Sequence, residues 1–219
     1  MNLFRQTLVL LRKEALLELR MNYAISGILL YVFATVFVVF VAFVQIQPQV
    51  WNTLFWIIAL FTSVNAIVKS FVQENSARQL YYYSLVHPIA ILLSKIMYNT
   101  ALLLLLSVLC WIGLGFVGGN PVRDAGQFVL AIVLASVGFS ITFTFIAAIS
   151  AKADNSATLM AILSFPLVIP ILLTLIKLSA NALRLLNDTG VMQDVWALIG
   201  IDLLLLAVAL VLYPFLWRD

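Results

Sequence analysis

Charged residues are scarce in this sequence. Asp, Glu, Lys and Arg together make up 10% of its 219 residues, whereas roughly 25% is usual in a soluble domain. Hydrophobic residues account for 64% and the mean hydropathy is +1.14. This composition excludes a soluble domain and predicts an integral membrane protein. The net charge of +3 then indicates basic loops on the cytoplasmic side of a membrane and not a nucleic-acid partner.

Cysteine and phosphate-binding motifs are also scarce. The single cysteine, Cys110, excludes an intrachain disulfide and a cysteine-based zinc or iron–sulfur site. The chain lacks the Gly-x-x-x-x-Gly-Lys spacing of a P-loop, so it does not bind ATP in that way by itself. We therefore expect no metal site and no catalytic residue in this chain.

Long apolar runs are what the sequence has in abundance. Six of them reach the roughly 20 residues that a helix needs to cross the hydrocarbon core of a bilayer. We treat residues 1–219 as one all-α membrane domain, in which Trp51 and Trp56 open the second span as interfacial aromatics. The transmembrane helices are expected near 23–44, 51–72, 90–117, 126–150, 157–177 and 194–217.

The amino-terminal segment 2–20 carries charges scattered among its apolar residues, so we expect no cleaved signal peptide. Its apolar residues recur at spacings of three and four, which favours a helix with two apolar rows. Such a helix suits the membrane interface, touching lipid with one side and protein with the other. An ordinary juxtamembrane helix without a function is the alternative. The rows are Phe4, Leu8, Leu11, Ala15 and Leu19, and Leu3, Leu10 and Leu17.

The cations predict the orientation of the spans. An even number of spans places both termini on one side, and that side with its loops holds nine of the twelve Lys and Arg residues. Because basic loops stay in the cytoplasm, we expect both termini there. The nine are Arg5, Arg12, Lys13, Arg20, Lys69, Arg78, Lys95, Lys152 and Arg218, and the other three are Arg123, Lys177 and Arg184.

The longest polar interruption, Lys69 to Lys95, lies between the second and third spans. From Glu74 to Val86 it has no Gly or Pro, which favours a short helix that Pro88 ends. We expect 73–88 to be a coupling segment, since an ATPase that closes on ATP moves membrane helices by gripping a rigid cytoplasmic element. The alternative is a solvated i,i+4 ion pair with tyrosines anchored at the interface. In the coupling interpretation, charged contacts with the ATPase would come from Glu74 and Arg78, and an apolar groove would be filled by Leu80, Tyr81, Tyr83 and Leu85.

Two features inside the expected spans are unusual. Pro166 and Pro170 fall on one face of the fifth span and free backbone carbonyls there, which predicts a conformational hinge or, alternatively, a packing bend. Asp202 is costly in lipid, so it should face protein or water and mark a functional site. Because we place it near the outer end of the sixth span, snorkelling to the interface is the alternative.

Two motifs in this chain resemble those of the cytochrome c maturation permease family, heme exporter protein B. The resemblance covers nearly the whole length. The first motif lies in the polar interruption and the second, more particular one in the fifth span. They are Phe71, Glu74, Gln79, Leu80, Pro88 and Lys95, and Pro166, Leu167, Ile169, Pro170 and Leu172.

The resemblance implies a six-span subunit of the ABC type-2 exporter class in the bacterial inner membrane. It also implies a complex with a separate ATPase subunit, a heme-handling membrane subunit, a periplasmic heme chaperone and a second copy of the chain. ATP hydrolysis would drive heme export or the release of the loaded chaperone, with Phe71, Gln79 and Pro88 among the coupling residues. Heme would be a handled ligand and not a covalently bound cofactor.

Other functions stay open on the residues alone. A type-2 permease for another cargo, such as a lipid-linked glycan or a drug, has the same architecture, and a non-transporting membrane scaffold is a third possibility. A proton-coupled transporter is disfavoured, because Asp202 alone would have to serve as an intramembrane relay. The single histidine, His87, is placed on the cytoplasmic side, so it does not supply axial heme ligation on the outer side.

Overall fold

The computed structural model describes residues 3–20, 23–43, 45–72, 86–150, 156–186 and 190–217, and these residues contain helices and no strand. The all-α prediction is confirmed for this part of the chain. The helices are α1 (Leu3–Arg20), α2 (Tyr23–Ala42), α3 (Pro48–Val72), α5 (Pro88–Gly118), α6 (Ala125–Ser150), α7 (Ser156–Ala182), α8 (Val191–Leu212) and the 3₁₀ helix η1 (Tyr213–Trp217).

Five of these helices, α3, α5, α6, α7 and α8, are long and apolar enough to cross a membrane. A shorter apolar stretch, Ser26–Ala42, lies in α2 at the position of the first expected span. These helices confirm an all-α membrane protein. A sixth crossing and the interfacial position of α1 remain predictions.

Proline and short polar side chains determine where several helices begin. Pro48 and Pro88 occupy first turns, where the missing N–H costs nothing. His87 caps α5, since its Nδ1 accepts a hydrogen bond from the Ile89 N–H at 3.3 Å. Asp124 caps α6 by accepting from the Gln127 N–H at 3.0 Å. Helix α7 continues past the expected end at 177, to Ala182.

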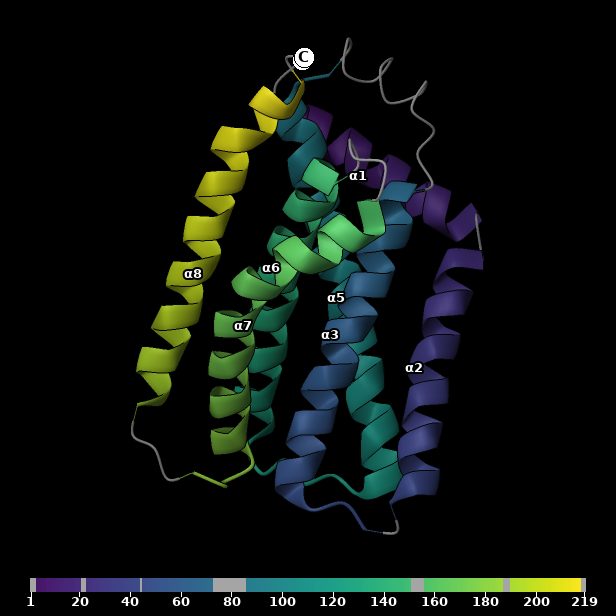
Figure 1. The fold of residues 1–219 in the computed structure, drawn as a ribbon, viewed down its shortest axis with the longest axis vertical. Helices are drawn as coiled ribbons and strands as arrows, with labels where there is room; N and C mark the ends of the chain where they lie inside the picture. Colours follow the sequence, from purple (N-terminus) through teal and green to yellow (C-terminus); the bar gives the residue numbers. More distant parts are fainter. Residues whose placement is uncertain are drawn as a thin grey trace.

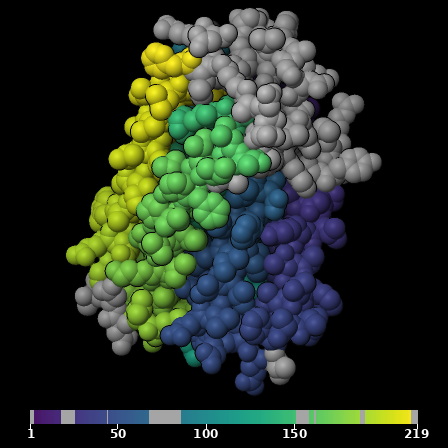
Figure 2. All heavy atoms as spheres, in the orientation of Figure 1, coloured from purple at the N-terminus to yellow at the C-terminus, as the bar shows by residue number. Residues whose placement is uncertain are grey.

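The helices form an up-and-down bundle with two ends (Figure 1). We call one the α1 end, because α1 lies across it beside the start of α5 and the end of α8, and the other the far end. Helix α6 is central and contacts α3, α5, α7 and α8. Figure 2 shows α8, α7, α3 and α2 side by side across one face of the molecule. Few of the described α6 side chains are therefore left to face lipid.

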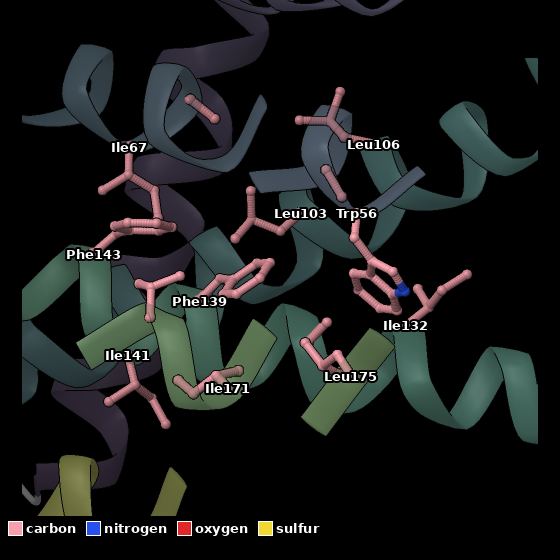
Figure 3. Close-up of a cluster of buried hydrophobic side chains, with 14 of the residues drawn as sticks. Trp56, Ile67, Leu103, Leu106, Ile132, Phe139, Ile141, Phe143, Ile171 and Leu175 are labelled. Atoms are coloured by element: carbon pink, nitrogen blue, oxygen red, sulfur yellow. The ribbon is translucent and has the colours of Figure 1, made fainter. Parts of the chain in front are cut away.

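The apolar core lies between α3, α5, α6 and α7, where Phe139 and Phe143 of α6 meet Leu103 of α5 and Ile171 of α7 (Figure 3). Large apolar side chains on the outer sides of α2, α7 and α8 are exposed, as expected for surfaces that contact lipid. Since lipid is as apolar as these side chains, close packing and hydrogen bonds must hold the bundle together.

Candidate functional site

At the α1 end, α1 packs against the first turns of α5. Leu10 is buried against Ala90 and Ile91, with Val86 beside them. The exposed large side chains of α1 include Phe4 and Leu8, which belong to the first apolar row predicted from the sequence. Leu10 of the second row thus supplies a protein contact, whereas Phe4 and Leu8 of the first row are exposed. Leu3 and Leu17 of the second row are exposed as well, so the two rows do not divide into one protein side and one lipid side.

Polar contacts join the same two helices. The Lys95 ammonium lies 3.6 Å from Glu14 Oε1, and the Lys95 side chain is only 3% exposed. The backbone N–H of His87 donates to Gln6 Oε1 at 3.3 Å. Removing one partner of a buried ion pair costs about 3–5 kcal/mol, because the other charge is left without compensation. Helix α1 and the start of α5 are thereby joined into one unit.

Most residues of the predicted coupling segment lie outside the described residues, namely Glu74, Arg78, Gln79, Leu80, Tyr81 and Tyr83. Two flanking members are placed: Phe71 belongs to the last turn of α3 and Pro88 is the first residue of α5. Both helix ends lie at the α1 end (Figure 1). The ATPase-coupling role of this segment therefore stays a prediction.

Pro166 and Pro170 both lie inside α7. In Figure 1 the first part of α7 runs obliquely across the bundle and its second part runs along it. Both prolines are exposed on the outer side of the helix, whereas Ser164 and Val168 point inward. These two inward residues help line an apolar pocket of about 30 Å³ between α3, α6 and α7. A bend next to unfilled space is the geometry that a hinge requires.

Asp202 lies near the middle of the 22-residue helix α8, not close to its end. It is 5% exposed and lies against Gly138 of α6, where an added Cβ would stand 2.5 Å from Asp202 Oδ1. Neither carboxyl oxygen has a hydrogen-bond partner in the described part of the chain. Snorkelling does not fit this position, because α8 begins at Val191 and Asp202 is consequently deeper than expected.

The CcmB protein family model matches residues 5–218 of this sequence. The chain belongs to the CcmB protein family. It is thus a multi-pass inner-membrane protein, a permease subunit and the membrane component of a heme exporter for cytochrome c maturation. No curated protein matches the chain. The resemblance seen in the sequence is confirmed at the level of the family.

No group of three or more His, Cys, Asp or Glu side chains that could hold a metal occurs among the described residues of this CcmB chain. The imidazole of His87 is engaged at the start of α5 at the α1 end. Cys110 is buried.

A hydrogen-bonded network at the far end of this CcmB chain was missed by the sequence analysis. Trp56 Nε1 donates to Ser179 Oγ at 2.7 Å, and Ser179 Oγ in turn lies 2.8 Å from Asn52 Oδ1. The Asn52 side-chain amide donates to the Ile176 carbonyl at 3.1 Å. These bonds tie α3 to α7 across the core.

Trp51 and Trp56 are therefore not interfacial anchors, which corrects the prediction made for them. Both indoles are buried inside the protein. Trp51 stacks on Phe55 with ring centroids 5.8 Å apart, and its Nε1 points to the Leu114 carbonyl at 3.5 Å. Their N–H groups find protein acceptors, so they need no headgroup. The spacing of Asn52 and Trp56, four apart on one helical face, was the available signal.

Proposed function

We propose that this permease subunit converts ATP hydrolysis by a separate ATPase chain into heme export or release of the heme-loaded periplasmic chaperone. The observation that carries the proposal is the junction of α1 with α5, directly after the predicted coupling segment. The segment joins the end of α3 to the start of α5. A force applied to it would act on both helices at once.

The buried Glu14–Lys95 pair supports a transmitting role for α5. Helix α5 contacts α1, α2, α3 and α6, so its displacement would reach most of the bundle. The ion pair and the Leu10 contact would oblige α1 to move with α5. These contacts favour a subunit that transmits movement from the ATPase over a passive scaffold. A passive scaffold would not require a buried charge at the junction of α1 and α5.

We further propose that the α1 end faces the cytoplasm and that the far end faces the periplasm. The basic side chains Arg5, Arg12 and Lys13 lie on α1, whereas Arg123, Lys177 and Arg184 lie at the far end. The heme-handling subunit would supply axial histidine ligands, since His87 is the single histidine of this chain and its Nδ1 caps α5 at the α1 end. A second copy of the chain would complete the ABC type-2 architecture.

One experiment separates docking from transmission. Arg78→Glu with Tyr81→Ala should weaken co-purification of the ATPase while leaving membrane insertion intact. Lys95→Gln should keep the ATPase bound and lower holo-cytochrome c on the order of tenfold, the size of a typical coupling between sites. Holo-cytochrome c, ATPase recovery and the amount of inserted subunit are measured together.

Lys13→Gln is the matched control for this experiment. Lys13 also contacts Glu14, at 3.2 Å, but its side chain is 23% exposed, so its loss should have little effect. Equal maturation by the Lys95 and Lys13 variants would contradict transmission through the buried pair. Unchanged ATPase recovery with the Arg78 and Tyr81 variant would contradict docking on the segment.

A further inference from the structure

Asp202 and Lys95 are the two buried charged residues among the described ones, and they differ in whether a partner of opposite charge lies beside them. Lys95 has the Glu14 carboxylate within 3.6 Å, whereas neither oxygen of Asp202 has a hydrogen-bond partner in the described part of the chain. Both side chains are almost fully buried. An isolated carboxylate in such a site costs far more free energy than a neutral group of the same shape.

Among the described residues, the elements packed on α8 place no cation beside Asp202. Helix α6 contains no titratable residue along Ala125–Ser150, and Lys177 is the one charged residue of α7. Lys177 lies 3.1 Å from Asp194, which stands eight residues before Asp202, about 12 Å along the helix. Tyr213 of η1 stands eleven residues after Asp202, about 16 Å along the helix, at the other end of α8.

The packing around the carboxyl is close on its α6 side. Gly138 lacks the Cβ that would stand 2.5 Å from Asp202 Oδ1, so the glycine makes the space that the carboxyl fills. The nearby Thr142 hydroxyl donates to the Gly138 carbonyl at 2.8 Å and is thus already engaged within its own helix. A metal cation would need several oxygen ligands, and no such cluster occurs among the placed side chains.

We propose that Asp202 is an intramembrane proton-binding site, occupied when α8 is packed against Gly138 of α6. The bound proton converts the carboxylate into the neutral acid, and no other bond is made or broken. Separation of α8 from α6 would admit water, and the carboxyl would then release its proton to that water. The site is a single position and not a relay, and it belongs to the α6–α8 interface, apart from the proposed coupling junction at the α1 end.

Infrared difference spectroscopy on the purified complex in lipid tests the proposal. At neutral pH the wild type should show the C=O band of a protonated carboxyl, shifted by deuteration and completely lost in Asp202→Asn. Asp194→Asn is the matched control, because Asp194 faces Lys177 and should leave the band unchanged. Absence of the band at neutral pH, or its persistence in Asp202→Asn, would overturn the proposal.

Thermal unfolding provides a second readout. Raising the pH should lower the midpoint of the wild-type complex more than that of Asp202→Asn, because only the wild type acquires an unpartnered buried charge. The amide should match the wild type at acidic pH, since it resembles the neutral acid in shape. A wild-type midpoint that does not fall relative to that of Asp202→Asn as the pH rises would contradict a bound proton.

Discussion

The network around Ser179 and the carboxyl of Asp202 are both buried between long apolar helices, but they differ in how their polar atoms are satisfied. At the far end, Trp56, Ser179 and Asn52 bond to one another and to the backbone of α7. Asp202, midway along α8, has no such partner in the described part of the chain. In lipid, where hydrophobic burial gives little advantage, satisfied polar contacts hold helices together. The comparison indicates a fixed α3–α7 contact and an α6–α8 contact that depends on a protonation state.

The largest effect should come from breaking the satisfied network. Trp56→Ala removes a fully buried indole and the donor to Ser179, which should cost about 3–5 kcal/mol. For a chain of this size each kcal/mol lowers the melting midpoint by about 2–4 °C. The midpoint in detergent and the amount of protein in the membrane are the measurements.

Trp196→Ala is the control for that variant, because Trp196 is 65% exposed on α8. Its loss should leave the midpoint nearly unchanged. If the Trp56 and Trp196 variants have the same melting midpoint, the far-end network does not stabilise the bundle. The α3–α7 contact would then not be the fixed contact inferred above.

A smaller effect is expected at the α6–α8 contact. Gly138→Ala places a methyl group 2.5 Å from Asp202 Oδ1, and such overpacking costs about 1–3 kcal/mol. Combining it with Asp202→Ala should restore much of the loss, because the shortened side chain leaves room for the methyl. The three variants form a double-mutant cycle read by melting midpoint.

Gly200→Ala is the matched control in that cycle, since a Cβ there meets nothing within 4 Å. It should be neutral or slightly stabilising, as expected for alanine replacing glycine in a helix. Additive effects of the Gly138 and Asp202 changes would show that the two residues do not share the space proposed for them.

Much of the fold could be predicted from the sequence, because apolar runs such as 126–150 and 90–117 are long and uninterrupted. The CcmB family could also be recognised, from motifs around Pro166 and Pro170. The contacts between residues on different helices could not be predicted from the sequence. Glu14 and Lys95 lie far apart in the sequence, and a count of cations treats each lysine as exposed. For Asp202 the sequence left burial in protein and snorkelling open, because the expected span began later than α8 does and placed the residue less deep.

The burial of Trp51 and Trp56 shows the same limit. A tryptophan near the start of a span is usual both at an interface and in a core, and only the acceptors on α5 and α7 decide between them. Such acceptors come from helices that are distant in sequence. Hydrophobicity therefore locates helices, whereas polar pairing determines which helices are held together.

The smallest effect on stability, with a clear effect on function, is expected from Pro166→Ala combined with Pro170→Ala. Alanine would restore the two helical hydrogen bonds that the prolines omit and would straighten α7 beside the apolar pocket. Both prolines are exposed, so assembly should stay within about 1 kcal/mol of the wild type while ATP use is uncoupled from cytochrome c maturation. Leu173→Ala, another exposed α7 residue, is the control. Subunit assembly, ATPase rate and holo-cytochrome c are measured together. If the double variant assembles and matures cytochrome c normally, the prolines form a packing bend. If it fails to assemble, their role is structural. A hinge is supported only if the variant assembles but does not mature cytochrome c.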